Sequence, residues 1–149
     1  MNQAQVNDIV QTLRLDVTLS HGVGLHLAVM SEPFLTYMLE GKKTIESRFS
    51  KHRIAPYKSI QTDDIVLLKK SAGPIVAHFK AGKVEFVELN EAELQRIKAE
   101  YGMAICADDD FWRAKVDRRY ATLIEVESLQ EIKPFAIEKR DRRGWVKLK

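Results

Sequence analysis

The order of strands and helices expected from the sequence constrains the fold of this chain most strongly. After residue 43, helices are expected only at 91–100 and 108–115. Strands are expected at 44–49, 65–69, 75–89 (bent or broken near Ala81-Gly82), 120–126 and 145–148. A doubly wound parallel sheet needs a helix after nearly every strand, so it does not fit this order. The sequence predicts an α+β, mainly β fold: a small, curved, mainly antiparallel barrel with peripheral helices.

Two helices and one strand are expected before this strand-rich part. Apolar residues at helical spacing predict a helix over 3–19, namely Val6, Ile9, Val10, Leu13 and Val17. A strand at 25–30 and a helix at 33–40 follow, the helix capped by Ser31 and ended by Gly41. We expect residues 1–20 to be a helical extension. This extension would pack either on the main domain or on a partner subunit. Packing on a partner subunit would give a homodimer.

The composition is that of one ordinary globular domain of 149 residues. No apolar run reaches the roughly 18 residues of a membrane helix. Residues 1–16 lack the basic start and apolar block of a secretory signal, so a cytoplasmic protein without a membrane span is expected. Cys106 is the only cysteine, which excludes an intramolecular disulfide. Neither a metal nor a cofactor is expected, because the histidines lack metal-ligand spacing: His21, His26, His52 and His78.

Charge is distributed unevenly along the chain. Residues 41–80 hold nine basic and three acidic side chains, and residues 133–149 hold seven basic and two acidic ones. Residues 85–110 instead hold eight acidic and two basic side chains. If the fold brings the two basic segments together, one face of the molecule will attract phosphates. Solvated charge on helices and loops is the alternative interpretation.

The densest polar cluster lies between the helix at 33–40 and the strand at 44–49. Gly41 permits the turn, Lys43 follows it, and Glu46 and Arg48 leave the same face of the strand because they are two residues apart. Arginine offers a bidentate fork for phosphate, and lysine offers a mobile point charge. Glu46 would brace Arg48, accept a base-edge amino group or act as a general base. An exposed ion pair is the simpler alternative.

The pattern G-x-K-x-x-E-x-R formed by Gly41, Lys43, Glu46 and Arg48 resembles the signature of the ASCH domain, within the PUA-like superfamily. The similarity covers roughly residues 25–148. It implies a PUA-like small antiparallel β-barrel over 25–149, with a helical insertion at about 90–118. Where that family usually has Gly-Asp before the next strand, this chain has Asp63-Asp64.

The resemblance also implies a function. Members of the ASCH family are thought to bind RNA or modified nucleotides in a cleft beside the first helix. Some similar small bacterial members hydrolyse N4-acetylcytidine, with a threonine at the position of Glu46 working with the lysine that matches Lys43. Other members are similar to nucleases. A hydrolase, either an N4-acylcytidine amidohydrolase or a ribonuclease, would use Lys43 and Glu46 as its catalytic residues.

A second basic cluster lies near the end of the chain. Trp145 follows the run 140–144, which contains Arg140, Arg142 and Arg143, and an aromatic beside basic residues suits base stacking and phosphate contact. A buried tryptophan that closes the barrel is the alternative. Arg53 and Lys70 would extend the basic surface. The interpretation we favour is binding of RNA, preferably single-stranded, or of a modified nucleoside. The hydrolase and a protein-interaction module are the alternatives.

Overall fold

The computed structural model of the chain describes residues 1–139 and 141–149, which contain five helices and six strands. The helices are α1 (Gln3–Thr12), α2 (Asp16–Leu19), α3 (Phe34–Leu39), α4 (Glu91–Ile105) and α5 (Asp109–Arg113). The strands are β1 (Leu25–Met30), β2 (Ile45–Ser50), β3 (Ile65–Lys70), β4 (Ile75–Glu88), β5 (Tyr120–Phe135) and β6 (Trp145–Lys147). Within the described residues, no helix is both long enough and apolar enough to cross a membrane.

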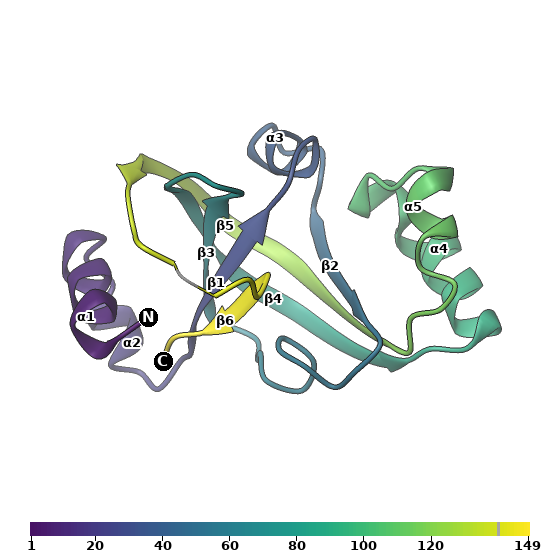
Figure 1. Cartoon of the computed structure of the whole chain (residues 1–149), viewed down its shortest axis with the longest axis horizontal. Coiled ribbons are helices and arrows are strands. Elements are labelled where there is room, and N and C mark those ends of the chain that lie inside the picture. The colour runs from purple at the N-terminus through teal and green to yellow at the C-terminus, as the bar shows by residue number, and fades with distance from the viewer. Residues whose placement is uncertain (140) are drawn as a thin grey trace.

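All six described strands form one sheet in the order β2-β5-β4-β3-β1-β6. Four of the five neighbouring pairs are antiparallel, and only β1 and β3 run parallel. The sheet curls into a half-barrel, with α1 and α2 at one end of the molecule and α4 and α5 at the other (Figure 1). The predicted α+β, mainly β, PUA-like fold class is therefore confirmed. The edge strands β2 and β6 are not paired with each other.

The N-terminal segment forms two helices where the apolar spacing predicts one. The chain breaks after α1 at Arg14, whose φ of 55° lies in the left-handed region and ends an α-helix. Val6, Ile9 and Val10 of α1 are buried in a cluster that also contains Leu25 of β1. The apolar face of α1 is thus covered by the chain's own sheet, which is the first of the two packing arrangements expected for this extension.

The two faces of β2 have different neighbours, as its alternating sequence predicts. Ile45 and Phe49 pack with the cluster around Ile97 of α4 and Trp112 of α5, outside the curl of the sheet. Glu46 and Arg48 lie on the opposite face, because side chains alternate along a strand. The α4–α5 segment between β4 and β5 therefore covers the outer face and leaves the two charged residues on the inner one.

Two elements extend beyond their predicted ends. Strand β5 continues to Phe135 rather than ending at 126, because its second half pairs with the first half of β4. Its sequence there is mostly polar and exposed, so no apolar alternation indicates a strand. Helix α4 continues to Ile105 rather than ending at residue 100, and the Ile105 side chain is buried in the cluster that covers β2. Strand β4 is continuous, with register shifts instead of a break near Ala81.

Candidate functional site

The turn after α3 brings Lys43 to the sheet. Gly41 has a φ of 78°, a conformation that costs glycine little, and its amide donates to the Met38 carbonyl. The amides of Lys42 and Lys43 then both donate to the carbonyl of Tyr37. Gly41 thus has a backbone role: it reverses the chain so that the next residues enter β2.

Lys43 is buried, with only 2% of its surface exposed. Its Nζ donates to the carbonyl oxygens of Ile45 at 2.8 Å and Ile105 at 3.1 Å, and it lies 3.5 Å from Glu46 Oε1. Ile105 ends α4, so the cation also satisfies an unpaired carbonyl at a helix C-terminus. Burial lowers the pKa of Lys43, although Glu46 opposes this shift. All three ammonium hydrogens thus have acceptors within the protein.

Glu46 carries the negative charge of this cluster and is 3% exposed. Its Oε1 accepts from the Ser47 amide at 2.8 Å, and its Oε2 lies 3.2 Å from Arg48 Nη2. Burial alone would raise the pKa of Glu46, but the charges of Arg48 and Lys43 hold it below its ordinary value. An ionised carboxylate with a lowered pKa is a weak base, so Glu46 is better suited to bracing its neighbours than to removing protons.

Arg48 spans the gap between β2 and the other edge of the half-barrel. Its Nη2 donates to Val29 O at 3.0 Å and its Nη1 to Gly144 O at 3.1 Å. With Glu46 also on Nη2, the Nε hydrogen and one Nη1 hydrogen have no acceptor among the described residues. The side chain is 23% exposed, so solvent reaches part of it.

Trp145 lies under Arg48 rather than on the surface. The indole is 4% exposed, and the guanidinium stands 5.2 Å from its ring centroid. The expectation of an exposed stacking platform at Trp145 is therefore corrected, because both faces of a ring at this depth are covered. The alternative interpretation, a tryptophan that packs inside the barrel, describes its position.

A buried hydrogen-bonded chain holds Trp145 in place, and the sequence did not indicate it. The indole N–H donates to His26 Nδ1 at 3.1 Å, so the other ring nitrogen, Nε2, donates to Asp64 Oδ2 at 2.8 Å. Asp64 also accepts from the amides of Gly24 and Gln61. In the sequence, only Asp64 gave a signal, because it matches the aspartate of the resembling family. His26 gave none, because it is one of several histidines scattered along the chain.

The buried His26 predicts an acid-sensitive stability. Burial lowers the pKa of His26 more than Asp64 raises it, so the unfolded chain takes up this proton at a higher pH than the folded chain does. We expect the free energy of unfolding to decrease as the pH falls below about 6.5. Burial also lowers the pKa of His78. In denaturant titrations, His26→Gln should therefore have a shallower pH slope than wild type, and an unchanged slope would contradict this assignment.

The structure brings Lys43, Glu46 and Arg48 to one cavity of about 320 Å³. Its remaining lining consists of Val29, Met30, Ser31, Phe34, Ser47, Phe49, Phe111 and Lys115. Phe111 forms edge-to-face pairs with Phe34 at 5.8 Å and with Phe49 at 5.7 Å between centroids, so three half-buried rings make an aromatic wall. The sequence did not indicate this wall, because its members come from three separate elements.

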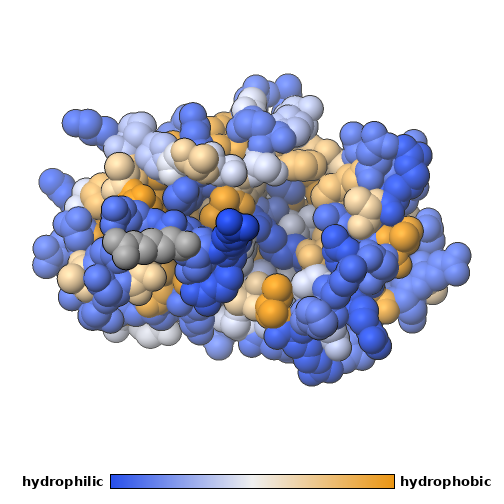
Figure 2. Space-filling model, in the orientation of Figure 1, coloured by the Kyte–Doolittle hydropathy of each residue, from blue (hydrophilic) through white to orange (hydrophobic). Residues whose placement is uncertain are grey.

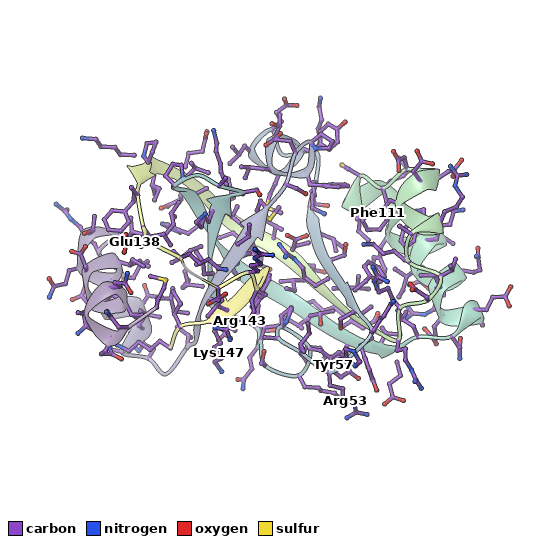
Figure 3. All side chains as sticks on the ribbon, viewed as in Figure 1. Arg53, Tyr57, Phe111, Glu138, Arg143 and Lys147 are labelled. Carbon is purple, nitrogen blue, oxygen red and sulfur yellow. The ribbon has the colours of Figure 1, made fainter. Side chains whose placement is uncertain are left out.

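The other predicted binding residues lie outside the lining of this cavity. Arg53 is exposed and pairs with Glu88 at 2.7 Å, near Tyr57 at the lower edge of Figure 3. Lys70 is exposed at the end of β3. Arg142 and Arg143 are exposed in the segment before Gly144, whose carbonyl contacts Arg48. Arg143 lies near the centre of Figure 3 and pairs with Asp141, and Arg140 lies outside the described residues.

The face of the molecule shown in Figure 2 is predominantly hydrophilic. Figure 2 shows one face of the molecule, on which hydrophilic side chains predominate and the hydrophobic ones form small separate patches. The two basic segments meet where Arg48 contacts Gly144. The carboxylates of the acidic segment are partly neutralised by Arg96, which pairs with Glu85, Glu93 and Glu100. The two segments therefore come together at Arg48, whereas Arg53 and Lys70 of the first segment lie outside the cavity lining.

The mixed, curled six-stranded sheet forms a half-barrel, and its overall fold is of the PUA-like type. Solved structures share it: the ASCH protein from Zymomonas mobilis matches with a TM-score of 0.66 at 12% identity, over 84% of this chain and 87% of the other. Two point mutants of that protein match at 0.67 and 13%, over 84% of this chain and 90% and 88% of theirs. No protein-family model and no curated protein matches the sequence significantly.

Proposed function

We propose that the chain is an ASCH-type domain that binds one unstacked nucleotide base, from single-stranded RNA or from a modified nucleoside, in the cavity beside α3. One observation carries the proposal: the same cavity combines the aromatic wall of Phe34, Phe49 and Phe111 with the two unused donors of Arg48. Aromatic faces suit unstacked bases, and charge-assisted donors suit phosphate or a base edge.

The size of the cavity favours single strands over duplexes. A volume of about 320 Å³ lies at the lower end of small-ligand pockets, which matches one nucleotide rather than a helix. Bases inside an RNA duplex are stacked and paired, so they cannot enter such a cavity without opening the helix. The salt dependence of affinity then reports the number of phosphate contacts.

The first test is an RNA titration. Single-stranded oligomers should bind more tightly than duplexes, with an affinity that falls between two salt concentrations. Arg48→Ala should weaken binding by about 1–3 kcal/mol, which is roughly 5- to 150-fold in Kd. Arg113→Ala is the matched control, because Arg113 is exposed on α5, carries the same charge and does not line the cavity.

Two outcomes would reject RNA as the ligand of the cavity. The first is an absence of salt-dependent affinity for every oligomer, and the second is wild-type binding by Arg48→Ala. Thermal unfolding of each variant shows whether a loss of affinity reflects a loss of fold, since Arg48 also bridges strands. Arg48→Lys retains the charge without the bidentate fork and should recover only part of the affinity.

Hydrolysis in the same cavity is the second candidate, favoured by the lowered pKa of Lys43 beside Glu46. The Lys43 ammonium already has three acceptors, and the Glu46 carboxylate is engaged by Lys43, Arg48 and the Ser47 amide, so neither group is free to activate a nucleophile. We expect no product when the protein is incubated with N4-acetylcytidine or with RNA oligomers. Turnover that is lost in Lys43→Met would replace the binding proposal with the hydrolase.

A further inference from the structure

Lys115 is a cation at the cavity that forms no ion pair with the described residues. It follows α5 in a turn, is half-buried, and its Nζ lies 4.8 Å from the ring centroid of Phe111 and 5.7 Å from that of Phe49. Among the described residues, no carboxylate lies within 4.0 Å of it. Nearby cations do have such partners: Lys51 and Arg118 both pair with Asp117.

Positive charge exceeds negative charge in this cavity. Of the described residues in the lining, three are cations, namely Lys43, Arg48 and Lys115, and one, Glu46, is a carboxylate. Burial lowers the pKa of Lys115, and Arg118 and Arg48 lower it further, while Asp117 opposes them only in part. A ligand that brings negative charge next to Lys115 and Arg48 would relieve this repulsion.

We infer that Lys115 and Arg48 together hold a phosphate group, with the attached base against the aromatic wall of Phe34, Phe49 and Phe111. This inference rests on the proposed function and narrows its ligand from any nucleoside to a phosphate-bearing nucleotide. Arg48 supplies a permanently charged guanidinium with two unpaired hydrogens, on Nε and Nη1, and Lys115 supplies a mobile point charge. The cavity has room for one such unit.

The phosphate has two sources with the same chemistry: a free mononucleotide or a phosphodiester within an RNA strand. A calorimetric titration with four probes separates them: a nucleoside, its monophosphate, inorganic phosphate and a short single-stranded oligomer of the same base. The monophosphate should bind about tenfold more tightly than the nucleoside. A tighter oligomer identifies the strand as the source, and equal affinities of oligomer and monophosphate identify the free nucleotide.

Lys115→Met is the decisive variant, because methionine retains the apolar contact with the rings and removes the charge. It should lower the monophosphate affinity severalfold more than the nucleoside affinity, and the monophosphate should still bind more tightly than the nucleoside because Arg48 remains. Lys98→Met is the matched control, since Lys98 is exposed on α4 and does not line the cavity. It should bind as wild type does.

The failure of this inference is distinguishable from failure of the proposed function. Equal binding of nucleoside and monophosphate, or wild-type monophosphate affinity in Lys115→Met, overturns the phosphate assignment and leaves the base-binding proposal standing. Absence of binding by all four probes overturns both. Binding of inorganic phosphate as tight as that of the monophosphate would show a site that ignores the base, which also overturns the inference.

Discussion

Glu46→Gln is expected to lower the free energy of unfolding by about 3–5 kcal/mol, as removal of one partner from a buried ion pair generally does. The carboxylate lies 3.5 Å from Lys43 Nζ and 3.2 Å from Arg48 Nη2, and it is the acidic residue of the cavity lining. Glutamine has nearly the same shape, but it leaves two cations without a counter-charge and turns an amide donor toward them. Denaturant titration at neutral pH measures the change.

The control for this variant is Glu88→Gln. Glu88 also pairs with an arginine, Arg53, at 2.7 Å, but both side chains are exposed to solvent. Exposed pairs contribute about 0–1 kcal/mol, so this variant should be close to wild type. A Glu46→Gln protein as stable as Glu88→Gln would show that Lys43 and Arg48 do not depend on the carboxylate, and the role of Glu46 as a brace would be lost.

Trp145→Ala is expected to have a comparable effect, about 3–5 kcal/mol, because it removes a large buried ring from the core. It also removes the platform under the Arg48 guanidinium and the donor to His26 Nδ1. Trp145→Phe separates these contributions: it retains an aromatic ring under Arg48 and loses the hydrogen bond. The buried acceptor left behind should cost about 1–3 kcal/mol.

Trp112→Phe is the matched control for Trp145→Phe. Trp112 is also buried and packs against Phe49 and Phe111, but its indole N–H has no hydrogen-bond acceptor among the described residues. Its replacement therefore loses ring volume alone. If denaturant titrations show equal losses for the two phenylalanine variants, then the hydrogen bond to His26 does not stabilise the fold.

Local patterns predicted the part of the site that lies close together in the sequence. The end of α3 at Gly41 follows from the preference of glycine for left-handed backbone, which its φ of 78° confirms. The shared face of Glu46 and Arg48 follows from the period of a strand. Asp63 stands where the resembling family has glycine. Its φ of 77° is left-handed, which explains the family's glycine and which aspartate tolerates.

The rest of the site depends on contacts between distant segments, which no local pattern encodes. Phe111 and Lys115 reach the cavity because α4 and α5 pack against β2, an edge strand whose two faces both contribute residues to the lining. Lys115 follows several aspartates in the sequence, so composition does not predict that it forms no ion pair with the described residues. The basic neighbours of Trp145 made it a candidate for surface stacking, with burial as the alternative, and its pairing opposite Ala28 of β1 places it inside.

The central claim is that the cavity beside α3 receives a nucleotide, and a crystal structure of the protein with a bound nucleoside monophosphate tests it most directly. The account predicts the base against Phe34, Phe49 and Phe111, with a phosphate oxygen within hydrogen-bond distance of the Arg48 guanidinium and the Lys115 ammonium. A nucleotide bound elsewhere, such as beside Arg142 and Arg143, with the cavity empty would contradict the account.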